Sequence, residues 1–509
     1  MDTIILFKYF TFFLATYFIL KYAFLGSKLK KLPPSPFLSF PIIGHLYLFK
    51  KPLHRFLANI ATKHDPILYL KFGSRPIILL SNPSGVEESL GRNDVFVNRP
   101  RLLPGKYNGN NYTTITWAPY GALWKNQRRI SAVEILSPQR LQILSRIRAD
   151  AARFFIIKMM KLIGNTKDGV VEMKSIIFGL TLDNLTRMII GKINYEHKDE
   201  YLRGFDNLVE QSSSRSGISN LEDFLPILKW FRPFWGTNNE KILKKTKDGK
   251  EEMMKALLEE HRKLEKDGNL GEDRTRSMLH VLLSLQKEDP HYYTDELIGY
   301  LILALFQAGV DSSSATLEWA LSLLVNHSEI LIKAQSEIDT NIGYNRLVEE
   351  SDKNNLPYIQ CIVNETLRMY PTVPLALPRE SISECEIGGY HIPNKSMLIY
   401  NIWAIHNDPN IWEEPRKFKP ERFAGVEGTR LGYKFLPFGI GKRVCPGEHL
   451  ANRVLWLNLA LMIQCFEWER VSQELVDMKE SGGVSLTKLE PLLVKCRPRS
   501  CMIDLLSQL

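Results

Sequence analysis

One cysteine, Cys445, lies in a glycine-rich loop that spans Phe438 to Gly447 and reads FGIGKRVCPG. Gly439, Gly441 and Gly447 let the backbone turn tightly and approach a flat partner closely, because glycine carries no Cβ. Backbone N–H groups around a sulfur favour the thiolate, which is the form of cysteine that binds a metal. An inert buried thiol is the alternative for a lone cysteine. The pattern predicts that Cys445 is the ligand of a metal held in a planar group.

A second set of chemically capable residues lies in the apolar segment from Asp295 to Leu324, which predicts a long buried helix. Ala308 and Gly309 are small enough to leave room for a diatomic ligand or water, and the glycine favours a kink. Asp311 is costly to bury unpaired, so we expect it to be paired or to transfer protons, with Ser312 as a relay. The alternative is close packing by the small residues and a structural salt bridge for the acid.

Two pairs of residues have helical spacing. Trp124 and Arg128 are four residues apart and share one helix face, where the forked donors of arginine suit a carboxylate. Glu365 and Arg368 are three residues apart and close enough to form an ion pair. On spacing alone the first pair is equally well explained as a surface aromatic and arginine, and the second pattern is weak.

The cysteine loop matches F-x-x-G-x-R-x-C-x-G at every fixed position, and in this the chain resembles the haem-thiolate cytochromes P-450. The family's other motifs arrive in order: a proline hinge, W-x-x-x-R, A-G-x-D-S, E-x-x-R and P-E-R-F. The resemblance implies a mainly α fold with small β-sheets, in which haem b lies between a long central helix and the cysteine-ligand loop. Ser312 departs from the commonest form of the family, which has threonine there.

The resemblance also implies a role for each matching residue. Cys445 would be the axial thiolate ligand of the haem iron, and Asp311 and Ser312 would be catalytic. The residues expected to contact the haem, some of them as propionate partners, are Trp124, Arg128, Ala308, Gly309, Arg379, Phe438, Arg443 and Gly447. Arg422 of the P-E-R-F segment would complete a buried structural network with Glu365 and Arg368.

Two segments are expected to form the walls of a substrate pocket. Pro371 to Pro378 is apolar and stiffened by prolines; simple packing is one interpretation, but in the family this strand lines the substrate side of the haem. The expected wall residues are Val373, Leu375 and Ala376. Ser481 to Leu486 contains a Gly-Gly turn suited to a hairpin tip that reaches the same pocket. Apolar walls indicate a small lipophilic substrate.

Composition narrows the possible functions. The 509-residue chain has a net charge of +10, and its Lys and Arg are spread without dense basic tracts, so nucleic-acid binding is not expected. Its six cysteines include no C-x-x-C pair, which indicates free thiols in a reducing compartment. No repeat or low-complexity block interrupts the body of the chain, which favours one catalytic domain.

The N-terminal residues 1–27 form an apolar leader long enough for a membrane-spanning helix. A cleaved secretion signal is the alternative, but no small-residue cleavage site follows. Because Lys28, Lys30 and Lys31 follow the leader, the positive-inside rule places the body in the cytosol. The expected organisation is a single-pass endoplasmic reticulum anchor (1–27), a basic and proline-rich hinge (28–40) and a catalytic domain (41–509).

The resemblance is strongest to plant microsomal members, particularly those that act on isoflavonoids and lignans and those that form methylenedioxy bridges. It implies a monooxygenase that takes electrons from NADPH through a membrane-bound reductase and hydroxylates or ring-closes a phenolic metabolite. Terpenoid and alkaloid substrates remain open, as do an O2-independent isomerase or dehydratase and a haem-based sensor. The acid and hydroxyl pair argues against the last two. Basic residues expected to meet the reductase are Lys125, Arg129, Lys434 and Lys442.

Overall fold

The computed structural model describes residues 31–92, 94–166, 168–191, 221–231, 238–271, 277–426 and 428–509, together with positions 9, 12 and 16. The predicted anchor, 1–27, and the first residues of the hinge, 28–30, lie outside the described residues apart from those three positions. The rest of the hinge, 31–40, is described.

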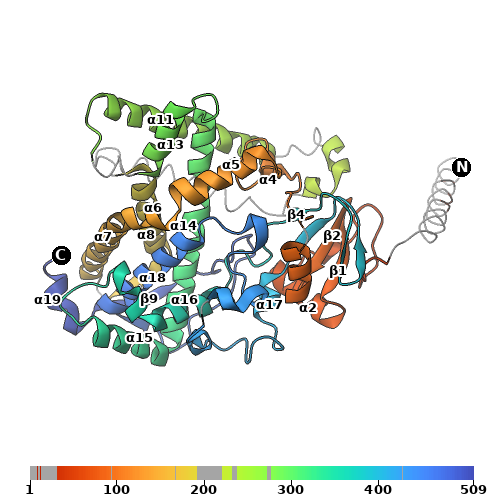
Figure 1. The fold of residues 1–509 in the computed structure, drawn as a ribbon. Coiled ribbons are helices and arrows are strands. Elements are labelled where there is room, and N and C mark those ends of the chain that lie inside the picture. The colour runs from red at the N-terminus through yellow and green to blue at the C-terminus, as the bar shows by residue number, and fades with distance from the viewer. Residues whose placement is uncertain are drawn as a thin grey trace, which may run out of the picture.

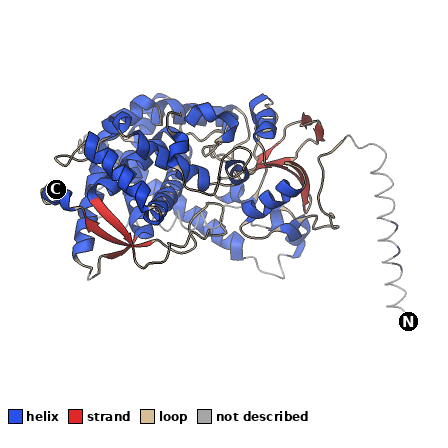
Figure 2. Ribbon diagram, turned by 90° about the horizontal axis from the view of Figure 1, so that it is seen from below, coloured by secondary structure: helices blue, strands red, loops and turns tan. Residues whose placement is uncertain are grey.

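Helices make up most of the described chain, and small sheets lie at its margins (Figures 1 and 2), as the resemblance implied. The α-helices are α2 Leu53–Lys63, α3 Pro83–Val86, α4 Leu103–Tyr107, α5 Ala122–Ile130, α6 Pro138–Ile143, α7 Ser145–Gly164, α8 Met173–Ile190, α11 Asn238–Lys266, α13 Met278–Glu288, α14 Asp295–Asn326, α15 Ser328–Asn341, α16 Pro357–Met369, α17 Ile402–His406, α18 Glu448–Cys465 and α19 Ile503–Leu506.

Three sheets join segments that are distant in the sequence. The strands are β1 Ile67–Phe72, β2 Arg75–Leu80, β3 Val170–Glu172, β4 Arg379–Glu380, β5 Cys385–Ile387, β6 Tyr390–Ile392, β7 Met397–Tyr400, β8 Phe466–Arg470 and β9 Leu493–Pro498. The largest sheet has the order β1-β2-β7-β4, in which β2 and β7 are parallel and the other neighbours antiparallel. The others are β3-β9-β8 and the β5-β6 hairpin. The N-terminal pair β1-β2 is therefore joined in one sheet by two strands from much later in the chain.

Helix α14 runs through the middle of the helical part of the molecule (Figure 1). The Thr294 hydroxyl caps it by accepting a hydrogen bond from the Leu297 N–H at 3.2 Å. Helices α8, α16 and α18 pack around it, which explains why it is apolar on nearly every side. Among the described helices, α14 alone is long and apolar enough to cross a membrane, but this packing identifies it as a core helix.

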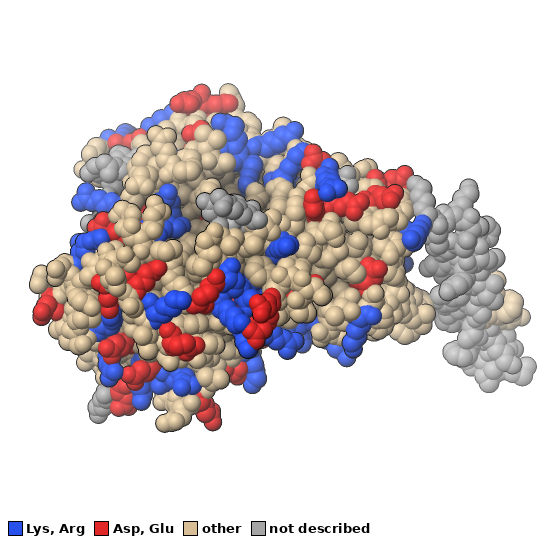
Figure 3. All heavy atoms as spheres, turned by 60° about the horizontal axis from the view of Figure 1, so that its bottom comes forward, with Lys and Arg blue, Asp and Glu red and all other residues tan. Residues whose placement is uncertain are grey.

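The main hydrophobic core lies where α14, α16 and α18 meet, at the end of the molecule remote from β1 and β2. Trp319 of α14 stacks on Tyr370 with ring centroids 3.9 Å apart, and the Trp319 indole donates to the Leu486 carbonyl at 2.8 Å. The core thus fixes the C-terminal hairpin against the central helix. On the face drawn in Figure 3, acidic and basic side chains are interspersed.

Candidate functional site

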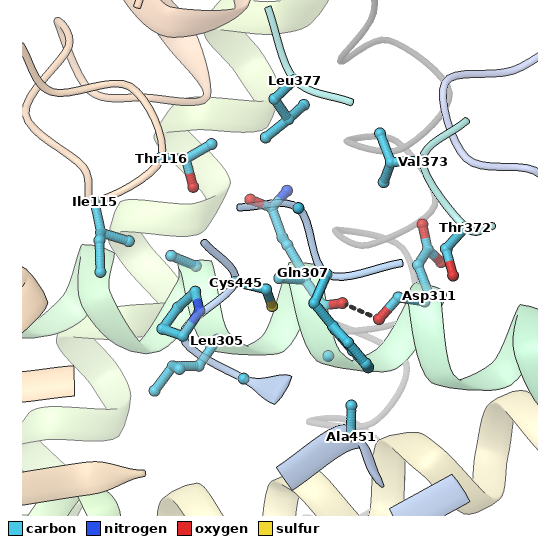
Figure 4. Close-up of a pocket in the computed structure, with 18 of the residues that line it drawn as sticks. Ile115, Thr116, Leu305, Gln307, Asp311, Thr372, Val373, Leu377, Cys445 and Ala451 are labelled. Atoms are coloured by element: carbon cyan, nitrogen blue, oxygen red, sulfur yellow. Dashed lines mark hydrogen bonds between the residues drawn. The ribbon is translucent and has the colours of Figure 1, made fainter. Parts of the chain in front are cut away.

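A cavity of about 420 Å³ lies between α14 and the loop that carries Cys445 (Figure 4). Its walls come from segments far apart in the sequence, including α5, α14, the chain after α16 and the start of α18. The residues predicted from sequence that line it are Trp124, Arg128, Ala308, Gly309, Asp311, Ser312, Val373, Ala376, Arg379, Phe438, Arg443, Cys445 and Gly447. The fold therefore brings the separate motifs to one place.

The cysteine loop holds the sulfur at the cavity by turns that require glycine. Gly439 and Gly441 both have a φ of 72°, and a Cβ on Gly441 would lie 2.7 Å from the Leu90 carbonyl oxygen. Gly447 precedes the first residue of α18, and a Cβ there would lie 3.8 Å from the Cys445 Sγ. Gly439 and Gly441 thus allow the turn, and Gly447 leaves space beside the sulfur.

The environment of Cys445 has opposing effects on its ionisation. Burial raises the pKa of the thiol, whereas the Gly447 N–H and the Arg128 charge favour the thiolate. The Cys445 N–H donates to the Phe438 carbonyl at 2.9 Å, which closes the loop behind the sulfur. A bound cation would complete the stabilisation of the thiolate, as metal coordination does for cysteine generally.

Four arginines border the cavity: Arg99, Arg128, Arg379 and Arg443. The Arg443 guanidinium donates to the Val97 carbonyl at 2.9 Å and the Ala118 carbonyl at 2.7 Å, while its Nη1 is buried without a partner in the described chain. Arg379 donates to the Ile440 carbonyl at 2.6 Å and leaves its buried Nε unpaired in the same way. These N–H groups are available for an acceptor in the cavity.

The charges of these arginines are not balanced by carboxylates of the described residues. Burial, and then the charge of Arg379, lowers the pKa of Arg443 to about 9. Burial, and then the charges of Arg379 and Arg443, lowers the pKa of Arg99 well below its usual value. A dianionic ligand would relieve this repulsion and use the unpaired N–H groups. Haem presents two propionates, so the residues present fit this cofactor.

Trp124 and Arg128 contribute to this cluster by contacts that the spacing did not reveal. The Trp124 indole N–H donates to the Ile115 carbonyl at 3.1 Å, and its ring lies 4.4 Å from the Arg443 guanidinium. Arg128 donates to the Val444 carbonyl at 2.7 Å, which ties α5 to the cysteine loop. In the structure Trp124 therefore positions Arg443, and Arg128 also fixes the loop. Arg99 was missed because it belongs to no recognisable motif.

Gly309 has a packing role that sequence analysis offered only as the alternative. A Cβ at this position would lie 2.6 Å from Cδ1 of Leu185, so the glycine allows α8 to approach α14 closely. Helix α14 continues through this point as one α-helix. Ala308 is exposed to the cavity, and its small side chain leaves space there beside the helix.

Asp311 and Ser312 both line the cavity beside the sulfur-bearing loop (Figure 4). The Ser312 hydroxyl donates to the Ala308 carbonyl, one helical turn earlier, at 2.5 Å. The lone pairs of the Ser312 oxygen can still accept a hydrogen bond from a donor in the cavity. One turn later, Thr316 donates to the Ser312 carbonyl at 2.8 Å, and its oxygen lies 3.3 Å from the Thr372 hydroxyl. Polar groups thus continue along this edge of α14 to the pocket wall.

Glu365, Arg368 and Arg422 form the buried network that the resemblance implied. Arg368 pairs with the carboxylate through Nε at 2.7 Å and Nη2 at 2.9 Å, and the Arg422 Nε lies 3.0 Å from it. Both Glu365 and Arg368 are 0% exposed. The remaining donors of Arg368 bind the carbonyls of His406 and Pro415 at 2.7 and 2.8 Å, so the network fixes the chain that leads to the cysteine loop.

His406 connects this network to the cysteine loop. Its Nδ1 lies 3.1 Å from the Arg368 carbonyl, and its Nε2 accepts the Leu436 N–H at 2.8 Å. Burial, and then the Arg368 charge, lowers the pKa of His406 to about 3, so the ring is neutral. Sequence analysis did not identify His406, because its role depends on contacts between distant segments.

The pocket wall after α16 follows the prediction in part. Val373 and Ala376 line the cavity, but Leu375 packs on the other side, in the cluster under the β1-β2 sheet. The chain turns here, because the Ala376 N–H donates to the Val373 carbonyl at 3.0 Å and Ala376 has a positive φ of 52°. Cavity-lining residues that sequence analysis did not name include Ile115, Thr116, Leu305, Gln307, Thr372 and Leu377 (Figure 4).

The predicted hairpin tip also reaches the cavity, through Val484 and Ser485. A β-bridge between Glu480 and Lys488 closes the hairpin. The Leu486 N–H donates to the Thr372 carbonyl at 2.8 Å, which fastens the tip to the wall after α16.

Comparison with known proteins identifies relatives along almost the whole chain. The family model for Cytochrome P450 matches residues 33–495. An isoflavone 2'-hydroxylase of Glycyrrhiza echinata is 41% identical over 505 residues, with 98% of both chains covered. The (+)-piperitol/(+)-sesamin synthase CYP81Q2 of Sesamum radiatum is 41% identical over 488 residues, covering 95% of this chain and 94% of that one.

A solved structure supports the same fold. The solved structure of a zebra fish cytochrome P450 with progesterone superposes with a TM-score of 0.76 at 24% identity, covering 88% of this chain and 100% of the other.

Proposed function

Since this chain belongs to the cytochrome P450 family, we propose that it oxidises a lipophilic phenolic plant metabolite, by hydroxylation or by oxidative ring closure. The chain is a haem-thiolate monooxygenase that uses O2 and electrons delivered from NADPH by a reductase. The observation that carries the proposal is the shared cavity of Cys445, the arginine cluster and the Asp311–Ser312 pair.

The chain's own residues supply three functions around the cofactor. When bound, haem supplies the iron that activates O2, and thiolate donation from Cys445 favours O–O cleavage. Arg379 and Arg443 would hold the propionates with their unpaired N–H groups. Apolar side chains from α14 and the chain after α16 exclude water and orient the substrate.

Proton delivery is assigned to Asp311 and Ser312. The Ser312 oxygen would accept a hydrogen bond from a donor in the cavity while its own O–H group donates to the Ala308 carbonyl. Asp311, half-buried and one residue earlier on the same helix, is assigned the exchange of protons with solvent. Serine can serve in place of threonine here because the bond to Ala308 fixes its side chain.

The substrate class rests on the relatives. The Glycyrrhiza echinata protein is named for hydroxylation of an isoflavone, and the Sesamum radiatum protein for synthesis of piperitol and sesamin. Both names denote phenol-derived plant products of two or more aromatic rings. A flat aromatic substrate of this kind suits a cavity bounded by Ile115, Leu305 and Leu377 (Figure 4).

A second part of the proposal is attachment to the endoplasmic reticulum membrane by residues 1–27, with the hinge 28–40 and the catalytic domain 41–509 in the cytosol. Two exposed apolar segments support it. Leu38 and Ile42 are 72% and 68% exposed, and Trp230 is 84% exposed. Both segments border the β1-β2 turn, because the Gly73 N–H donates to the Ile43 carbonyl and the next N–H to the Phe224 carbonyl. Exposed apolar surface of this kind is suited to a bilayer.

A membrane-bound reductase would dock on the cysteine side. Lys125 and Arg129 are exposed on α5, the helix that Arg128 ties to the cysteine loop. Lys442 lies in that loop and is exposed, although it pairs with Asp94 at 2.5 Å. Lys434 is exposed just before the loop. Acidic groups of a reductase would be attracted to these residues.

The proposal is tested with the full chain in membranes together with a plant reductase and NADPH. A panel of isoflavones and lignans is incubated under air and under argon, and products are identified by mass. We expect a product with one added oxygen, or a ring closure with loss of two hydrogens, that needs both NADPH and O2. Turnover under argon without NADPH would instead establish an isomerase or dehydratase.

Attachment is tested separately by fractionation. The full chain is expected in the alkaline-carbonate pellet, and a chain lacking residues 1–27 is expected to be released at least partly. Release of the full chain by carbonate would contradict the anchor.

A further inference from the structure

A buried lysine faces the substrate cavity from the side opposite the cysteine loop. Lys250 of α11 lines the cavity and is 1% exposed. Its Nζ has one partner in the described chain, the Asn108 side-chain oxygen, at the long distance of 3.4 Å. An ammonium group has three donors and is costly to bury without an acceptor. This residue is therefore available to an acceptor that the described residues do not supply.

The nearest acid on α11 is used elsewhere. The Glu251 carboxylate accepts the Tyr300 hydroxyl at 2.6 Å and lies 3.4 Å from the Lys247 ammonium. No carboxylate of the described residues forms an ion pair with Lys250. Burial alone lowers the pKa of Lys250 to about 8, so the group is still mostly protonated at neutral pH.

The point at which α11 crosses α14 indicates how far Lys250 lies from the reacting end of the cavity. Helix α11 crosses α14 near Gly299, where a Cβ would lie 3.2 Å from Met254 (Figure 1). At about 1.5 Å of rise per residue, Tyr300 is about 12 Å along the helix axis from Ala308. A ligand of about this length would extend from Ala308 towards the crossing of α11, the helix from which Lys250 lines the cavity.

We propose that Lys250 selects substrates that carry an acidic oxygen, phenolic or carboxylic, at the end remote from the oxidised carbon. The Lys250 ammonium donates a hydrogen bond to this oxygen, and the Asn108 amide N–H donates a second one. The apolar walls between these two residues and the reacting end of the cavity hold the flat body of the molecule. This inference rests on the proposed function, because it names the substrate class of the same cavity.

The test compares ligands that differ only in the acidic oxygen. The probes are a 7-hydroxyisoflavone with its 7-methyl ether, and biphenyl-4-carboxylic acid with its methyl ester. Dissociation constants for haem-loaded full-length protein are measured by calorimetry and by the ligand-induced shift of the haem spectrum. We expect the acidic member of at least one pair to bind about tenfold or more tightly, as a hydrogen bond to a charged group provides. The pair that shows the preference identifies the source of the oxygen.

Lys250→Met should abolish this preference while leaving the affinity for the ether or ester within about twofold. Lys250→Gln, which keeps a donor without the charge, should retain a small part of it. Lys255→Met, on an exposed face of the same helix, is the matched control and should behave as the wild type. If Lys250→Met does not fold, the glutamine variant provides the comparison.

The inference is overturned if the wild type shows no preference in either pair, binds none of the probes, or keeps the preference in the Lys250 variants. Failure of the proposed function is read independently. It would appear as a wild-type protein that takes up haem and binds these ligands but does not oxidise them with NADPH and a reductase.

Discussion

Ser312 shows how a single hydroxyl is placed for chemistry without the methyl group of threonine. The hydrogen bond from its Oγ to the Ala308 carbonyl restrains the side chain that lacks β-branching. The oxygen then faces the cavity shared with Asp311 and Cys445. The hydroxyl and the acid both line the cavity, so we expect each to compensate partly for loss of the other.

We expect Ser312→Ala to lower the product formed per NADPH roughly tenfold and to raise hydrogen peroxide release. The loss is smaller than the at least about hundredfold effect of a direct acid–base group, because Asp311 remains. Product and peroxide are quantified against NADPH consumed. Ser312→Thr is the control and should couple as well as the wild type. Unchanged coupling in the alanine variant would remove Ser312 from the mechanism.

At the scale of elements, the helix that carries these residues is positioned by its close contact with α8. Gly309 faces Leu185, and the space available there is smaller than a methyl group. Replacement by alanine would combine a gain in helix propensity of about 1 kcal/mol with an overpacking cost of about 1–3 kcal/mol. A β-branched residue gains less helix propensity than alanine and adds more volume, so it is the clearer probe.

Gly309→Val is therefore expected to destabilise the protein by about 2 kcal/mol through overpacking against α8. The double variant with Leu185→Ala should be more stable, by about 1 kcal/mol or more, than the sum of the two single effects predicts. The reason is that Leu185→Ala removes the side chain that clashes with the valine at position 309. The measurement is a double-mutant cycle in urea at fixed haem occupancy. Additive effects of the two changes would contradict the contact.

A second contact between elements is the ion-pair network of Glu365, which anchors α16 to the chain preceding the cysteine loop. Glu365→Ala leaves Arg368 buried without its carboxylate, which should cost about 3–5 kcal/mol. We expect the variant to be recovered without haem, as read from the ratio of Soret to protein absorbance. Glu421→Gln is the matched control, since Glu421 is an exposed acid of the same P-E-R-F segment that pairs with Lys333. A stable, fully haem-loaded Glu365→Ala protein would refute the role.

The sequence predicted this site well where chemistry is confined to short motifs and poorly where it depends on contacts between distant segments. Cys445 and the α14 residues could be found because their spacing is local. Arg99 and Lys250 could not, because a lone arginine in a loop and a lysine in a charged helix carry no signal of burial. Leu375 was wrongly assigned to the pocket wall because a turn at Ala376 breaks strand alternation.

At the scale of the whole molecule, the N-terminal part is joined to the C-terminal hairpin by one buried acid. Glu480 lies at the base of the hairpin, and its side chain is 2% exposed. It accepts two hydrogen bonds from Arg55 of α2, at 2.9 and 2.5 Å, and lies 3.0 Å from His54. Because Val484 and Ser485 at the hairpin tip line the cavity, this contact also fixes one wall of the site.

This contact predicts a pH dependence of stability. Burial raises the pKa of Glu480, but the bonds from Arg55 and His54 outweigh it and lower the pKa to about 2. A carboxyl with a depressed folded-state pKa stabilises the protein above its unfolded pKa of about 4.3 and loses that contribution as the pH falls towards 2. Glu480→Gln should cost about 2 kcal/mol at pH 7, and the difference from wild type should shrink below about pH 4. Denaturant unfolding of both proteins from pH 7 to pH 3 measures this, and a difference that does not change with pH would contradict it.

The central claim is that the Cys445 sulfur binds haem iron as a thiolate in the cavity described. The most direct test is the carbon monoxide difference spectrum of the reduced, purified full-length protein beside its Cys445→His variant. We predict the strongly red-shifted Soret band of a thiolate-ligated haem for the wild type and its loss in the variant. An imidazole-type spectrum in the wild type, or a thiolate-type spectrum in the variant, would contradict the account.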